Sequence, residues 1–260
     1  MTSHTALART ASARIARTTL AALGTGLLLA GCSLPDGAFS DGARKTATAD
    51  ATVTEAVTAV EVTGARAGSI EVTPGTGPGV TIRRTVHYRD GAAPTPGQKV
   101  TGGVLTFTDG CSASCYVDYR LEVPATATVK LENSSGRITV TGVAGADLEA
   151  DSGSVSADRI GGPLRIRTSS GDIEATGLSG PRADVHSDSG DARLDFAKAP
   201  SEVTAETTSG DVSLKVPRAS YRLAVSTTSG GRHVTLPDEA SAPSRLSAKT
   251  TSGDVHISAV

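Results

Sequence analysis

The sequence predicts an all-β protein whose strands form a β-solenoid, and three observations support this prediction. Hydrophobic residues make up 38% of the 260 residues but aromatic residues only 3%, and the apolar content is mostly Val, Leu, Ile and Ala beside many Thr and Ser. This composition favours strands over helices. A Ser-Gly dipeptide recurs about every 20 residues in the second half of the chain. Apolar and polar residues alternate on both sides of each dipeptide, as expected for strands with one buried face.

The repeat defines the predicted strands. Aligned on the glycine, every unit has an apolar residue seven positions before it and another five positions before it. The position three before the glycine is small and mostly hydroxylated, and apolar residues return two and four positions after the glycine. Each unit is therefore expected to be a strand, a Ser-Gly corner and a second strand. The predicted corner glycines are Gly136, Gly153, Gly171, Gly190, Gly210, Gly230 and Gly253.

Stacked parallel strands explain this repeat better than a series of hairpins. Glycine accepts the positive φ of a tight corner, so a two-residue hairpin at each Ser-Gly is the alternative. A meander would not need the same residue columns in every unit, whereas stacked rungs place each column's residues above one another. We therefore predict a right-handed parallel β-helix of about seven or more rungs. The sixth unit, SGGRHVTL, fits only after a two-residue slip of Val234 and Leu236, which predicts a bulge or widened corner.

The regular repeats occupy residues 126–260. Residues 52–125 read as strands throughout but lack the regular columns, so they form either irregular first rungs or a capping sheet, and the sequence leaves both open. Between units, segments rich in Pro and Gly, such as RIGGP at 159–163, end the strands and vary in length. The variable surface of the solenoid is expected on that side.

The first 31 residues are predicted to be a lipoprotein signal peptide. Three arginines precede an apolar run, residues 20–30, that is too short to span a membrane as a mature helix. The run ends in LAGC, residues 29–32, which resembles the bacterial lipobox. The resemblance implies that Cys32 is lipidated and becomes the mature N-terminus, followed by a flexible tether over residues 32–51. The alternative is an ordinary secretion signal with an incidental cysteine.

Cys111 and Cys115 are the remaining cysteines. Export to an oxidising compartment makes a disulfide the expected state of this pair. A redox pair would favour the C-x-x-C spacing, and a metal site would need further ligands nearby. Closing so short a loop should stabilise the fold by only about 2 kcal/mol.

The repeated SGD-V-x-L unit behind a lipobox resembles a bacterial family of β-strand repeats of unknown function that is labelled "putative adhesin". The resemblance covers roughly residues 50–260. It implies a repeat architecture and a general role in the cell envelope, since some relatives are associated with envelope-stress systems. It supplies no catalytic residue.

Asp172, Asp191 and Asp211 follow the Ser-Gly dipeptide in three successive units and are weak candidates for a metal site. Carboxylates stacked on neighbouring rungs repel one another unless a cation such as Ca²⁺ compensates. The alternative is that each aspartate accepts hydrogen bonds from its own turn and faces water. We favour the alternative, because the sequence does not match a calcium-binding nonapeptide repeat.

No residue pattern predicts catalysis or a cofactor. His186, Asp188 and Ser189 are close in sequence. However, Ser189 occupies a corner position that is serine in all seven units, and a catalytic nucleophile would not need to be repeated. Three further histidines show no ligand-like spacing and are expected on the surface: His87, His233 and His256.

We therefore expect a non-enzymatic, adhesin-like protein of the cell envelope, held by lipid on the extracytoplasmic face of the cell membrane. Its expected partner is an unidentified envelope protein or glycan. Nucleic acid is not expected, because the formal charge is −2 and neither sign forms a long run. Two alternatives remain: an envelope-stress accessory protein, and a carbohydrate-active β-helix enzyme that would use the three aspartates.

Overall fold

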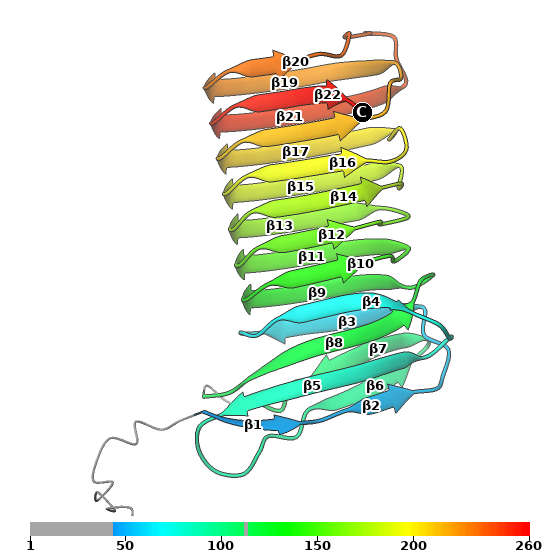
Figure 1. The fold of residues 1–260 in the computed structure, drawn as a ribbon, viewed down its shortest axis with the longest axis vertical. Coiled ribbons are helices and arrows are strands. Elements are labelled where there is room, and N and C mark those ends of the chain that lie inside the picture. The colour runs from blue at the N-terminus through cyan, green and yellow to red at the C-terminus, as the bar shows by residue number, and fades with distance from the viewer. Residues whose placement is uncertain (1–43, 112–113) are drawn as a thin grey trace, which may run out of the picture. The chain divides into compact units, whose positions relative to one another are not determined.

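Every regular element that the computed structural model describes is a β-strand (Figure 1), and the description covers residues 44–111 and 114–260. The strands form two sheets, one of twelve strands and one of ten. No helix in these ranges has the length and apolar character needed to cross a membrane. The predicted signal peptide and Cys32 lie outside the described residues. The all-β prediction is confirmed.

The first strand of each repeat unit belongs to the ten-stranded sheet. These strands are parallel, and their residues pair along the columns of the repeat. Their bounds are β9 (Thr128–Ser135), β11 (Gly145–Ser152), β13 (Leu164–Ser170), β15 (Arg182–Ser189), β17 (Glu202–Ser209), β19 (Tyr221–Ser229) and β21 (Ser244–Ser252).

The second strand of each unit belongs to the twelve-stranded sheet, again in parallel pairing. The bounds are β10 (Ile138–Thr141), β12 (Val155–Asp158), β14 (Ile173–Leu178), β16 (Ala192–Phe196), β18 (Val212–Val216), β20 (Arg232–Val234) and β22 (Val255–Ala259). The chain therefore alternates between the two sheets, and one strand from each sheet makes a rung.

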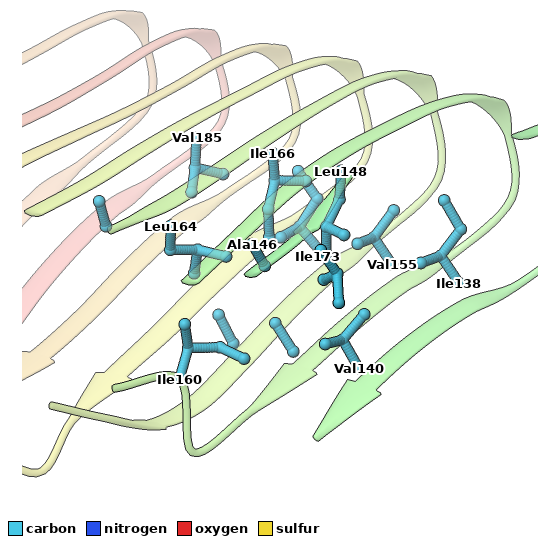
Figure 2. Close-up of a cluster of buried hydrophobic side chains, with 14 of the residues drawn as sticks. Ile138, Val140, Ala146, Leu148, Val155, Ile160, Leu164, Ile166, Ile173 and Val185 are labelled. Carbon is cyan, nitrogen blue, oxygen red and sulfur yellow. The ribbon is translucent and has the colours of Figure 1, made fainter. Parts of the chain in front are cut away.

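The predicted apolar columns form the core between the sheets. Leu148 pairs with Leu131 and Ile166 on the neighbouring strands, and all three side chains are buried. Residues between them face outward, so one face of each strand packs and the other is solvated. Burying each such side chain contributes roughly 1.5–3 kcal/mol. Figure 2 shows side chains from both sheets meeting in this space, among them Leu148, Ile166, Val155 and Ile173.

A ridge of glycines marks the corners of the rungs. The seven predicted corner glycines have φ angles between +129° and +149°, which side chains with a Cβ rarely adopt. A Cβ on Gly190 would also overlap the carbonyl oxygen of Gly171 in the rung below. Glycine is thus required both by the backbone angle and by the space. Thr207, three residues before Gly210, links two neighbouring corners, since its Oγ1 donates a hydrogen bond to the Gly190 carbonyl oxygen at 3.1 Å.

The last two rungs are exchanged relative to the order of the sequence. β21 lies between β17 and β19, and β22 lies between β18 and β20. The C-terminal rung is therefore interior, and the rung that precedes it in the sequence ends the stack (Figure 1). The glycine ridge follows this order, since Gly253 lies above Gly210 and Gly230 lies above Gly253.

The sixth unit contains no slip, so the predicted bulge was wrong. Arg232 pairs with Val255 and Val234 pairs with Ile257, which is the regular register. Arg232 thus occupies a column that is apolar in the other units. The exception is tolerated because no further rung covers β20, whose three residues are all exposed. Arg232 Nη1 lies 3.5 Å from the carbonyl oxygen of Val225 on the opposite strand, over the open end of the core.

Eight strands precede the regular repeats: β1 (Lys45–Thr48), β2 (Ala51–Val53), β3 (Ala59–Ala65), β4 (Ile70–Gly75), β5 (Val80–Tyr88), β6 (Gly97–Thr101), β7 (Val104–Thr108) and β8 (Tyr116–Pro124). β3 and β4 pair parallel to β9 and β10 and form one more rung. Antiparallel pairs β5–β8 and β6–β7 follow, with β1 and β2 along β5. The region combines both alternatives that the sequence left open.

The segments rich in Pro and Gly connect the second strand of one rung to the first strand of the next. Ile160 in one of these segments is buried, as is Leu178 at the end of β14, so both side chains point inward. These loops therefore close the core opposite the glycine ridge.

Candidate interaction surface

The aspartates after the corner glycines form a ladder of hydrogen bonds along the stack. Asp172 Oδ1 accepts the backbone N–H of Asp191 at 3.0 Å, and Asp191 Oδ1 accepts that of Asp211 at 2.9 Å. The donor belongs to the next rung, not to the aspartate's own turn, which corrects that expectation. Because parallel rungs lie in exact register at the corner, each carboxylate lies beside the next backbone N–H.

Asp254 and Asp118 belong to the same pattern, although neither was among the predicted metal candidates. The N–H of Asp254 donates to Asp211 Oδ1 at 2.7 Å, because the exchange of rungs brings these two residues together. Asp254 Oδ1 in turn accepts the N–H of Gly231 at 2.7 Å. At the other end, Asp118 Oδ1 accepts the N–H and the hydroxyl of Ser69 at 2.7 and 3.0 Å. The irregular strands around Asp118 gave no alignment that could have revealed it.

These contacts favour a structural role for the ladder over a calcium site. The second oxygen of Asp191 lies 2.6 Å from Arg193 Nη2, so both oxygens of this carboxylate have a hydrogen-bond donor. Carboxylates that accept backbone hydrogen bonds can stack without a bridging cation.

Asp118 also contacts His87, whose Nε2 lies 2.8 Å from Asp118 Oδ2. Burial is the largest single influence and raises the pKa of Asp118. The hydrogen bonds from the Ser69 N–H, from His87 and from the Ser69 hydroxyl outweigh it, so the pKa lies below its ordinary value. The charged carboxylate thus ties β8 to the first rung.

His186, Asp188 and Ser189 do not build a catalytic triad. His186 Nε2 lies 3.4 Å from Asp188 Oδ1, with 38% and 62% of the two side chains exposed. Ser189 lies at the exposed corner, where its backbone pairs with the corner serines of both neighbouring rungs. A triad needs a buried carboxylate and an oriented nucleophile, and this arrangement supplies neither.

The outer face of the ten-stranded sheet carries a groove of about 590 Å³. It crosses β3, β9, β11, β13, β15 and β17 near the beginnings of these strands. Small outward residues on adjacent strands, Ala59, Thr128 and Gly145, leave a hollow between longer charged side chains, and Pro163 lies beside them. The sequence columns gave no signal for this hollow, because it depends on positions just before the apolar alternation begins.

Charges of both signs line the groove. One outward column alternates in sign along four adjacent strands: Lys130, Asp147, Arg165 and Asp184. Lys130 Nζ lies 3.0 Å from Glu132 Oε1, and this hydrogen bond with its attraction raises the pKa of Lys130. Such a surface does not select a ligand of a single charge.

Cys111 and Cys115 lie at the corner that joins β7 to β8. Their Cα atoms are 5.5 Å apart and their sulfur atoms are bonded. This separation lies within the range of protein disulfides. The arrangement agrees with the predicted disulfide, and free-thiol titration of the purified protein is the measurement that checks it.

Two histidines that were expected on the surface without a role lie together at the C-terminal end of the stack. His233 on β20 pairs directly with His256 on β22, and their rings stack with centroids 4.7 Å apart. Asp254 contributes a third side chain to this cluster. The assumed two-residue slip hid the relation; in the regular register both histidines stand three positions after their corner glycines.

Comparisons with known proteins agree with this architecture. The family model described as Toastrack DUF4097 matches residues 99–260. No curated protein matches the chain. A solved "putative adhesin" from Bacteroides fragilis is 13% identical, with 84% of this chain and 99% of that chain covered and a TM-score of 0.50. A second, from Parabacteroides distasonis, is 14% identical over 83% of this chain and 98% of that chain, with a TM-score of 0.46.

At these identities the Bacteroides fragilis structure shows the fold alone. The family match rests on the sequence itself and extends over more than half of the chain. Together they confirm the resemblance to a family of β-strand repeats. The chain belongs to the Toastrack DUF4097 family.

Proposed function

We propose that this protein is a lipid-anchored, extracytoplasmic and non-enzymatic component of the cell envelope that binds an envelope protein or glycan through the groove on its ten-stranded sheet. The groove is the observation that carries the proposal, because the repeated columns, the glycine ridge and the aspartate ladder are all explained by folding. The coil is right-handed in this proposal, as crossover connections between parallel strands nearly always are.

The groove suits an extended polar ligand. Its lining comes from six neighbouring strands and alternates between positive and negative side chains. A peptide or an oligosaccharide offers donors and acceptors along its length and could pair with both signs. A polyanion would be repelled by the carboxylates of Asp147 and Asp184. The adhesin names of the solved relatives belong to the same class of function.

A charge reversal in the groove tests the binding surface. We expect Arg165→Glu to weaken binding of an unlipidated form, produced without the signal peptide and Cys32, to isolated cell envelopes at least about tenfold, since one like-charge contact costs about 1.4 kcal/mol or more. Arg137→Glu makes the same change at an exposed corner outside the groove and is the matched control. Unchanged binding by Arg165→Glu, or equal losses in both variants, would reject the groove as the binding surface.

Membrane attachment rests on the lipobox that ends at Cys32. Two or three acyl chains hold a protein firmly, whereas one gives only marginal binding. Cys32→Ser should move the protein from the membrane fraction to the soluble fraction, and Cys111→Ser should leave it in the membrane. Retention of the Cys32→Ser protein would contradict lipid anchoring without bearing on the groove.

A further inference from the structure

Three metal-ligating side chains gather on the terminal rung, among the residues that the structure describes. They are His233 on β20, His256 on β22 and Asp254 just before β22. One ligand atom of each lies within 4.8 Å of the others. Both histidines are exposed and Asp254 is partly exposed, so a metal ion has access from solvent.

The fold positions these three groups. The two imidazole rings are nearly parallel, with 12° between their planes, because the histidines are direct neighbours in the sheet. Asp254 stands two residues before His256 and so faces the same side of the sheet. Its Oδ1 accepts the N–H of Gly231 at 2.7 Å, which orients the carboxylate and leaves Oδ2 available.

Gly231 keeps the space between the ligands open. Several other units carry aspartate at this position, after the corner glycine. A Cβ on Gly231 would lie 2.9 Å from His233 Nε2 and 3.5 Å from Asp254 Oδ1. The terminal rung therefore lacks a side chain at a position where it would crowd the cluster.

We propose that His233, Asp254 and His256 bind a transition-metal ion of the zinc class. Two imidazole nitrogens and a carboxylate oxygen are ligands that Zn²⁺ accepts, whereas Ca²⁺ and Mg²⁺ prefer oxygen ligands alone. The exposed rings turn to bring one nitrogen each to about 2.1 Å from the ion, and water takes the fourth position.

The ion fastens the end of the stack. One ligand comes from β20, which has three residues and a neighbour on one side only, and two come from the adjoining interior rung. Because the ion binds the cluster only when β20 is docked, it stabilises the docked state in proportion to its concentration. This inference goes beyond partner binding and does not depend on the groove.

Zinc titration of the purified protein, prepared in detergent without an oligohistidine tag, tests the site. Calorimetry with ZnCl₂ should show binding that His233→Gln and His256→Gln each weaken at least about tenfold. His186→Gln is the matched control, because His186 is another exposed histidine beside an aspartate, and it should bind zinc like the parent protein. All three variants change exposed side chains, so their circular dichroism should be unchanged.

Hydrogen exchange gives a second readout. Zinc should slow exchange in β20 and just after it, for example at the Thr235 N–H that donates to the Ile257 carbonyl oxygen at 3.0 Å, and should leave β13 unchanged. A chelator should reverse the effect. Equal zinc affinity in the parent protein and His233→Gln, or zinc binding that leaves exchange in β20 unaltered, would overturn the proposal.

Discussion

The two ends of the stack are closed in different ways. At the N-terminal end, the antiparallel pairs β5–β8 and β6–β7 fold over the first rung, and the inward residues of β5 and β8 are buried. At the C-terminal end, one of the repeat units serves as the cap, and all three residues of β20 are exposed. The end rungs of a stack must tolerate contact with water. In this chain a separate set of strands covers the N-terminal end, and an altered repeat unit forms the C-terminal end.

The N-terminal cap buries two polar side chains, those of Arg84 and Tyr119. Arg84 is buried within the cap, and its Nε donates to the carbonyl oxygen of Ala49 at 2.6 Å. Burial lowers the pKa of Arg84, against smaller opposing effects of Tyr119 and Asp50. Burial likewise raises the pKa of Tyr119 to about 12. The Arg84 hydrogen bond links β5 to the segment between β1 and β2.

The C-terminal cap instead accepts exposure. Leu223 and Val225 on β19 occupy core columns but are only partly buried. Arg232 replaces the apolar residue of its column and covers the opening. A charge on the last rung also discourages a second copy from stacking there. The departure of the sixth unit from the repeat thus marks the end of the stack.

The largest expected effect is in hydrogen exchange, which distinguishes the observed order of the rungs from their order in the sequence. Amides of β22 should be protected on the order of a thousandfold more than those of β20, because β22 is interior and β20 is not. If the rungs followed the sequence order, the C-terminal strand β22 would instead exchange fastest. Amide exchange resolved by mass spectrometry or NMR decides between the two.

Substitution of a corner glycine should destabilise the protein differently in an interior rung and in the terminal rung. We expect Gly210→Ala to destabilise the protein by more than about 3 kcal/mol, because backbone strain and overlap with the Gly190 carbonyl add together. Gly230→Ala should mainly detach the terminal rung. Gly161→Ala is the control, since a Cβ there meets nothing closer than 3.6 Å, and urea unfolding should find it nearly neutral.

The N-terminal cap should depend on Arg84. Arg84→Ala leaves the Ala49 carbonyl oxygen without its donor, and we expect a loss of about 2 kcal/mol in the free energy of unfolding. The neighbouring Arg83 has 62% of its side chain exposed and pairs with Glu122 at 3.4 Å. Arg83→Ala should therefore cost less than about 0.5 kcal/mol by the same urea measurement. Similar losses would mean that burial of Arg84 adds no stability to the cap.

The smallest effect concerns pH at the same cap. The pKa of Asp118 is lowered in the folded state, so its contribution is complete above the unfolded value of about 4 and is lost as pH falls through the folded value. Asp118→Asn should cost about 1 kcal/mol at neutral pH. The difference in stability between parent and variant should shrink below about pH 4. A difference that stays constant in acid would contradict the assigned role.

Sequence reasoning succeeded where the same contact recurs in every unit. Leu148 and Ile166 were assignable to the core because seven aligned units repeat their pattern, and the corner glycines for the same reason. It failed where a single unit departs from the pattern. Arg232 in an apolar column suggested a slip, because an alignment cannot distinguish a shifted register from a rung without an outer neighbour.

The sequence by itself determined the strands, their inward faces and the corners, because these follow from the alternation of side chains and from the need for glycine at positive φ. Only the tertiary structure decided which rung lies last, which side chains meet across neighbouring rungs, and where the outer face is hollow. The physical reason is that every unit offers nearly the same edges and apolar columns to any other unit. The order of stacking therefore depends on which rung is destabilised least when one of its faces is exposed to water.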